Sequence, residues 1–221
     1  MNKIIGYIVF AVLMGCVHSV LAAGQHADHP RKDSTEIMYL NVDTGQSVVK
    51  WKGTEMRGSD SHEGTLKLRE GRLELKNGLL EGGYFIADMH SITVTDIPES
   101  DPVPRRYLTE HLESEDFFYV EKFPTAGFEI THTQKLEGNK VRVTGNLSVR
   151  DVTKEVEFVA DKTQTSEATM YKASFIIDRF EYNISYQGSY WKRITSLIDN
   201  NFVDAEILIS VELVANPPNN Y

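Results

Sequence analysis

The chain has 221 residues, 41% of them hydrophobic and 25% charged, a balance typical of a globular protein. Its formal net charge is −9, from 23 Lys and Arg residues against 32 Asp and Glu residues, and no basic tract interrupts the sequence. Such a chain lacks the electrostatic footprint that binds phosphate backbones, so we expect no nucleic-acid partner. A single cysteine excludes an intrachain disulfide and a Cys-rich metal centre.

Residues 1–22 have the layout of an export signal. Lys3 supplies a positive charge, and residues 4–14 form an apolar run too short to span a bilayer as a helix. Two processing alternatives stay open: cleavage after Ala22, or a lipoprotein-type signal that ends before a lipidated Cys16. We therefore expect a periplasmic or otherwise exported protein, or one tethered to the envelope membrane through Cys16.

The remainder divides into a leader, one domain and a short tail. Residues 23–37 are polar and contain Pro30, which predicts a flexible leader. Residues 38–215 carry the alternating pattern described next, and residues 216–221 form a C-terminal tail.

Apolar and polar residues alternate with a period of two along many short runs of this domain. Asn77-Gly78 and Gly138-Asn139 predict tight hairpin turns, and Gly71 inside a run of alternating leucines predicts a bend or bulge. One buried apolar face and one solvent-exposed polar face per strand are typical of antiparallel sheets. Closure of such a sheet into a barrel removes its exposed edge strands. The pattern therefore predicts an all-β, eight-stranded antiparallel barrel, with a sandwich as the alternative.

One segment, residues 102–115, breaks the alternation. Leu108, His111 and Leu112 recur at helical spacing, and Pro104 suits a first helical turn. We expect a short helix of about ten residues that caps one end of the barrel together with the two aromatic residues Phe117 and Phe118. The alternative is a plain crossover between two halves of the sheet.

The inward-facing positions are almost entirely apolar, so a ligand in the barrel would be hydrophobic. The residues predicted to line such a tunnel are Trp51, Leu68, Phe85, Met89, Phe128, Leu147, Phe158, Phe175 and Ile177. Leu108, Phe117 and Phe118 would close one end, and Tyr182, Tyr186 and Trp191 would surround a mouth, because aromatic rings suit a partly wet rim. The alternative is a core packed by its own side chains.

Polar candidates are few. His111 and Arg105 could contact a ligand head group, although a structural histidine and a solvated arginine are the alternatives. No inward constellation of ionisable groups suits acid–base chemistry, and no nucleotide-binding, metal-binding or nucleophile motif is present. We therefore expect no catalytic residue, no metal and no cofactor other than a bound lipid.

Several segments resemble the YceI family of bacterial exported proteins. The most specific is residues 111–128, HLESEDFFYVEKFPTAGF, and GGYFIADM at 82–89 and VTGNL at 143–147 add to it. The resemblance spans about residues 39 to 215 and implies a lipocalin-like barrel with a hydrophobic pore that binds long isoprenoid chains such as polyisoprenoid quinones. Some members are dimers, so a homodimer is an open alternative. The sequence departs from the family at Asn146 and Glu155, which leaves ligand length and head group undecided.

These observations predict an exported protein that sequesters or carries a long apolar isoprenoid or related lipid in the barrel. The alternative is a structural or interaction module of the cell envelope with a packed barrel and no ligand. An enzyme acting on a lipid is a third hypothesis, which would need titratable groups that converge inside the barrel.

Overall fold

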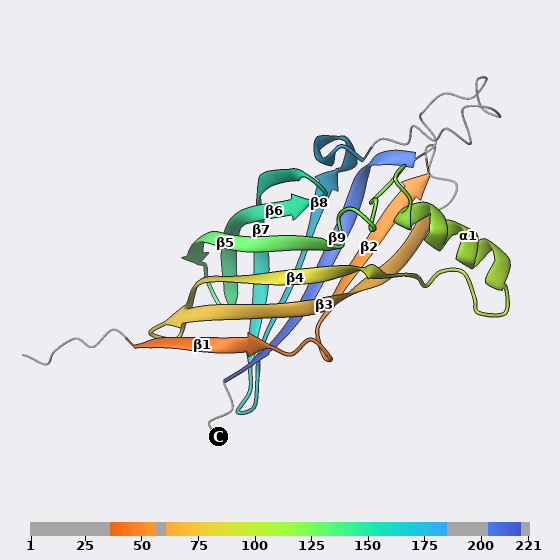
Figure 1. Cartoon of the computed structure of the whole chain (residues 1–221). Helices are drawn as coiled ribbons and strands as arrows, with labels where there is room; N and C mark the ends of the chain where they lie inside the picture. Colours follow the sequence, from red (N-terminus) through yellow and green to blue (C-terminus); the bar gives the residue numbers. More distant parts are fainter. Residues whose placement is uncertain (1–35, 56–60, 185–202, 218–221) are drawn as a thin grey trace, which may run out of the picture. The chain divides into compact units, whose positions relative to one another are not determined.

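The computed structural model describes residues 36–55, 61–184 and 203–217. Within these ranges the chain forms nine β-strands, one α-helix and one short 3₁₀ helix (Figure 1). The elements are β1 (Ile37–Val42), β2 (Val48–Glu55), β3 (Ser61–Lys76), β4 (Leu79–Val94), α1 (Pro102–Glu113), β5 (Thr125–Lys135), β6 (Lys140–Val149), β7 (Val152–Gln164), β8 (Thr169–Asp178), η1 (Arg179–Tyr182) and β9 (Val203–Asn216).

The strands close into an antiparallel barrel. Each of β2 to β9 pairs with its neighbour in sequence order, and β9 pairs back to β2, which completes a ring of eight strands. β1 pairs with the second half of β3 and with the end of β9, so it continues the position that β2 occupies. The predicted eight-stranded antiparallel barrel is confirmed.

The long strand β3 changes its inward face halfway along. Leu66 and Leu68 are buried in its first half, whereas Leu73 and Leu75 are buried in its second half. The register against β4 shifts between Leu68 and Glu70, next to Gly71. The bend or bulge predicted at this glycine is therefore confirmed, and it keeps leucine side chains inward in both halves of the strand.

Hairpin turns connect the strands at one end of the barrel. Asn77 and Gly78 have φ angles of 51° and 76°, the left-handed conformation that a tight two-residue hairpin requires. Gly138 has a φ of 66° in the β5–β6 connection. Both predicted turns are confirmed. We call this end, with the connections at 77–78, 136–139 and 165–168, the turn end.

The opposite end carries α1, η1 and the segment between α1 and β5, and we call it the helix end. The twelve residues of α1 lie close to the predicted helix, and Leu112 from it, with Phe117 and Val120 from the following turns, joins the hydrophobic core. In Figure 1, α1 lies at the right, away from the β3–β4 and β5–β6 turns at the left. Among the described residues no helix has the length and apolar character needed to cross a membrane.

Candidate functional site

The inner face of the barrel carries a row of phenylalanine rings. Phe85 of β4 lies 5.3 Å from Phe128 of β5, measured between ring centroids, and Phe128 lies 5.4 Å from Phe158 of β7. Phe158 in turn stacks on Phe175 of β8 at 4.8 Å. The row crosses β6 at Gly145, where a Cβ atom would come within 2.4 Å of the Phe128 ring. The glycine thus makes room for two rings to meet across its strand.

A small void lies beside this row. Its volume is about 30 Å³, and its lining is almost wholly apolar. The lining residues are Leu73, Leu80, Phe85, Phe128, Ile130, Val143, Phe158, Ala160, Tyr171, Ala173, Val211 and Leu213. A space of this size holds about one water molecule. With the rings in these positions, the void is too small for a chain-like molecule.

A larger groove opens at the turn end. It has a volume of about 580 Å³ and is lined by residues of the β3–β4 turn and of β4 to β8. These residues are Gly78, Leu79, Leu80, Glu81, Thr133, Lys135, Gly138, Asn139, Lys140, Val141, Lys162, Gln164 and Tyr171. Leu80 and Tyr171 line both this groove and the interior void. The groove is therefore the vestibule of the barrel interior, and we call it the turn-end groove.

Two lysines of the turn-end groove stand on inward-facing positions of their strands. Lys162 follows Phe158 and Ala160 along the inner face of β7, and its Nζ donates a hydrogen bond of 3.0 Å to the Gly78 carbonyl oxygen. Lys135 pairs with the buried Val141 and so shares its face of the sheet. Burial, together with the charge of Lys135, lowers the pKa of Lys162.

Tyr171 is the polar residue at the boundary between groove and void. Its side chain is 5% exposed, and its hydroxyl has no hydrogen-bond partner among the described residues. Burial raises the pKa of this hydroxyl to about 12, so it stays protonated and can donate a hydrogen bond at neutral pH.

At the helix end, aromatic side chains cluster behind α1. The rings of Phe117 and Phe118 meet edge to face at 4.8 Å, and His111 lies 6.0 Å from Phe117. Burial lowers the pKa of His111, against the opposing effect of Asp116. Phe117 belongs to the core and Phe118 packs against it, and closure of this end by the two rings stays a prediction.

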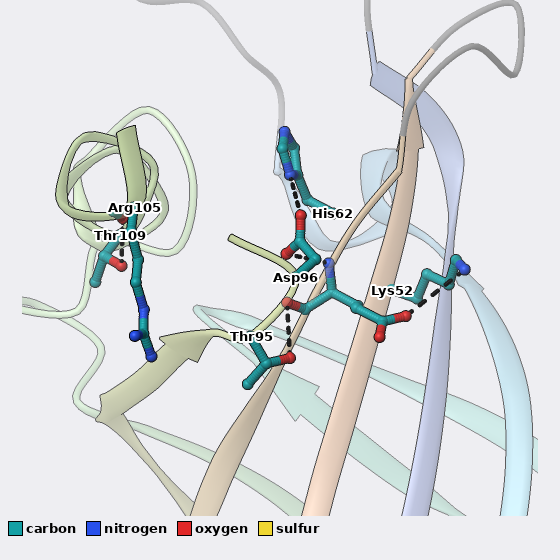
Figure 2. A network of polar contacts seen from close by, with 7 residues as sticks. Lys52, His62, Thr95, Asp96, Arg105 and Thr109 are labelled. Atoms are coloured by element: carbon teal, nitrogen blue, oxygen red, sulfur yellow. Dashed lines mark hydrogen bonds and ion pairs between the residues drawn. The ribbon is translucent and has the colours of Figure 1, made fainter. Parts of the chain in front are cut away.

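Arg105 forms an ion pair with Glu99 at 3.4 Å, and its carbonyl accepts a hydrogen bond from Thr109 within α1. Figure 2 draws Arg105 and Thr109 together with a second polar network, which centres on Asp96. Asp96 accepts hydrogen bonds from the ring of His62 at 2.7 Å and from the amide of Glu63 at 3.0 Å. Burial alone would raise the pKa of Asp96, but these hydrogen bonds hold it below its usual value.

The Asp96 network ties the segment after β4 to the start of β3. Thr95 adds a hydrogen bond to the Glu63 carbonyl, and the Glu63 carboxylate pairs with Lys52 at 3.6 Å (Figure 2). No group of three or more histidine, cysteine, aspartate or glutamate side chains in the described ranges is arranged to hold a metal ion.

Where the structure describes them, the predicted tunnel and rim residues belong to the hydrophobic core or pack against it. Phe85, Phe128 and Phe158 line the void itself. The remaining predicted residues belong to the surrounding core or pack against it, namely Trp51, Leu68, Met89, Leu108, Leu147, Phe175, Ile177 and Tyr182. Tyr186 and Trp191 lie outside the described residues. Contact of any of them with a ligand stays a prediction.

Sequence reasoning missed the lysines of the turn-end groove. Continuing the alternation of Phe158 and Ala160 by one step reaches Lys162, so a signal for this residue was available. Lys135 gave no such signal, because the register of β5 against β6 shifts between Ile130 and His132 and changes which residues face inward. The inner surface is thus apolar at its middle and cationic at one rim.

The fold and the interior define the class of this molecule: a closed antiparallel barrel with an apolar inner face that opens to one rim. The chain matches the YceI-like domain family over residues 40–215, and it belongs to that family. The resemblance drawn from the sequence is confirmed.

Two comparisons with solved structures show the same fold. BcnA of Burkholderia cenocepacia superposes with a TM-score of 0.63 at 20% identity, over 79% of this chain and 99% of that chain. A polyisoprenoid binding domain from Saccharophagus degradans, implicated in plant cell wall breakdown, superposes with a TM-score of 0.58 at 11% identity, over 83% of this chain and 100% of that chain.

Curated relatives match over shorter segments. The UPF0312 protein plu2095 of Photorhabdus laumondii is 49% identical over 47 residues, which are 21% of this chain and 24% of that protein. The protein YceI of Salmonella arizonae is 45% identical over 51 residues, 23% of this chain and 26% of that protein. The matched segments thus span about a quarter of the length of these relatives.

Proposed function

We propose that this protein is an exported, non-catalytic carrier that holds a long apolar isoprenoid or related lipid in its barrel. The observation that carries the proposal is the apolar interior void, which shares Leu80 and Tyr171 with the open turn-end groove. Membership of the YceI-like family and the fold shared with a polyisoprenoid binding domain support it.

Loading requires that aromatic rings move. The void beside Phe128 is about 30 Å³, far smaller than a prenyl chain. Phe85, Phe158 and Phe175 are partly exposed although they face inward, so their rings have free space on one side. Binding would gain ~25 cal/mol for each Å² of apolar surface removed from water, less the cost of ordering the chain.

The test is lipid content and uptake. We expect organic extraction and mass spectrometry of the full chain, purified without denaturation, to yield a bound lipid, and we expect delipidated protein to take up geranylgeraniol. Phe158→Asp places a charge on the inner face and should abolish uptake, whereas Val159→Asp at the exposed neighbouring position should not. Stability is measured for both variants, so that loss of fold is distinguished from loss of binding.

One observation favours a second candidate, a packed interaction module of the cell envelope without a ligand. It is the small volume of the same void, which leaves the described interior close to full. The absence of bound lipid together with a failure to take up geranylgeraniol would support this module and reject the carrier.

Export is the remaining part of the proposal, and it depends on residues 1–22, which lie outside the described residues. The apolar run after Lys3 favours a periplasmic or otherwise exported location. The intact mass of the mature chain distinguishes cleavage after Ala22 from lipidation of Cys16, and an unprocessed mass would contradict both.

A further inference from the structure

The turn-end groove is cationic, although the chain as a whole is acidic. Three lysines and one glutamate are the charged residues that line it: Lys135, Lys140, Lys162 and Glu81. The formal charge of the chain is −9. Lys140 is paired with Asp161 at 2.7 Å on the outer side, so Lys135 and Lys162 are the cations available to the groove.

Lys162 reaches across the rim of the barrel. It stands on β7, while its hydrogen-bond acceptor, the Gly78 carbonyl oxygen, belongs to the β3–β4 turn, with β5 and β6 between them in the ring. An ammonium group has three N–H donors, and this bond uses one of them. The other donors lie at the opening of the groove beside Lys135, whose charge acts on the same group.

Tyr171 pairs with Lys162 across the β7–β8 ladder, and its hydroxyl is the polar group to consider next. It is buried, it has no partner among the described residues, and its residue lines both the groove and the apolar void. A buried polar group without a hydrogen-bond partner is unfavourable, and such groups in native proteins point to an acceptor that completes them. Tyr171 therefore offers an unused donor beside Lys162, on a residue that lines both the groove and the void.

We propose that the turn-end groove binds the anionic head group of an amphiphile, such as a phosphate, whose chain continues past Tyr171 into the barrel. Lys135 and Lys162 would supply the positive charge, and the Tyr171 hydroxyl would donate a hydrogen bond to the same head group. The inference rests on the proposed carrier function, and it selects a charged amphiphile over a neutral isoprenoid as the preferred ligand.

The test compares three probes on the full chain by titration calorimetry: geranylgeranyl phosphate, geranylgeraniol and inorganic phosphate. We expect the prenyl phosphate to bind at least about tenfold more tightly than the alcohol, because charge-assisted hydrogen bonds are worth a tenfold change or more. Inorganic phosphate should bind far more weakly than the prenyl phosphate, since it lacks the chain.

In Lys135→Met/Lys162→Met the ratio of the two prenyl affinities should fall to about one through weaker binding of the phosphate. Lys135→Met alone should reduce the ratio several-fold, and it keeps the Lys162–Gly78 bond should the double variant fail to fold. Lys67→Met removes an exposed lysine on the outer face of β3, between the buried Leu66 and Leu68, and should retain the ratio of the unmodified protein.

The outcomes separate the two proposals. Equal affinity for alcohol and phosphate, or a preference that survives in the double variant, would overturn the head-group site and leave the carrier intact. Binding of neither prenyl compound would overturn both. Inorganic phosphate that binds as tightly as the prenyl phosphate would show a free-phosphate site, and the amphiphile assignment would be wrong.

Discussion

The rings of Phe158 and Phe175 stack with their centroids 4.8 Å apart and their planes 9° apart, just beyond the point where the strands that carry them cease to pair. The β7–β8 ladder ends at the pair Ala160 and Ala173, one inward-facing position earlier. Side-chain contact therefore continues this junction of the barrel wall where the backbone ladder stops.

The stack should contribute a measurable coupling energy. We expect a double-mutant cycle with Phe158→Leu and Phe175→Leu to give about 0.5–1.5 kcal/mol of coupling in the free energy of unfolding, the range of aromatic pairs. Urea denaturation of the four proteins measures it. A parallel cycle of Phe175→Leu with Tyr39→Leu, at an exposed position of β1, should be additive. Additive behaviour of the Phe158 cycle would contradict the role of the stack.

A side chain at position 145 should destabilise the fold. An added Cβ would lie 2.5 Å from the Glu129 carbonyl oxygen and 2.4 Å from the Phe128 ring. We expect Gly145→Ala to destabilise the fold by about 1–3 kcal/mol in urea denaturation, because the backbone oxygen cannot move aside cheaply. Gly127→Ala is the control, since a Cβ there meets no atom within 4 Å. Equal stability of the two variants would refute the explanation.

The stability of the fold should depend on an arginine at the buried position 179. It is 1% exposed, and its guanidinium donates to the carbonyl oxygens of Ile184 at 2.8 Å and Asp204 at 3.1 Å. Arg179→Met leaves both acceptors without this donor, and we expect a loss of at least ~2 kcal/mol in the free energy of unfolding. Thermal and urea denaturation measure the loss.

The conservative change tests the geometry of this site. Arg179→Lys keeps the charge but not the fork of donors, so we expect it to recover less than half of the loss. Arg69→Met, at an exposed position of β3, should change stability little. A lysine variant as stable as the unmodified protein would show that charge alone matters at this position.

Glu212 should make folding stability depend on acidic pH. Hydrogen bonds from Lys172 at 2.8 Å and Lys50 at 2.9 Å lower the pKa of its carboxyl to about 2. A folded-state pKa below the unfolded value stabilises the fold above the unfolded pKa, and this contribution disappears as the pH falls toward the folded pKa. The window is therefore from just above pH 4.5 down to about pH 2.

The measurement is the difference in unfolding free energy between the unmodified protein and Glu212→Gln across this window. We expect about 1 kcal/mol at neutral pH, discounted because the site is partly exposed, and a decline toward zero at about pH 2. Glu206→Gln, at an exposed position of β9, is the matched control. A difference that does not change with pH would contradict the assignment.

The barrel could be predicted because successive side chains of a strand point to opposite faces, so each strand appears in the sequence as alternating apolar and polar residues. Phe158 and Phe175 face inward, as their parity requires. Lys135 could not be placed, because Thr131, His132 and Thr133 are all polar and conceal the register shift between Ile130 and His132. A shift by one residue moves the side chains that follow to the other face, and no local pattern marks where it occurs.

The size of the void could not be predicted from the sequence either. Whether Phe85, Phe128 and Phe158 fill the centre or surround a channel depends on their ring orientations, and those depend on contacts between distant strands. Composition and parity fix which atoms face inward, not how closely they approach one another.

The junction between β7 and β8 is held by five residue pairs, against ten between β6 and β7 and ten between β8 and β9. A closed barrel widens with the least loss of backbone pairing at the junction that has the fewest residue pairs. Near the helix end the circumference can grow at this junction with a smaller loss of ladder bonds than at either flanking one. A ligand that required a wider barrel would therefore disrupt the least backbone pairing at the β7–β8 junction.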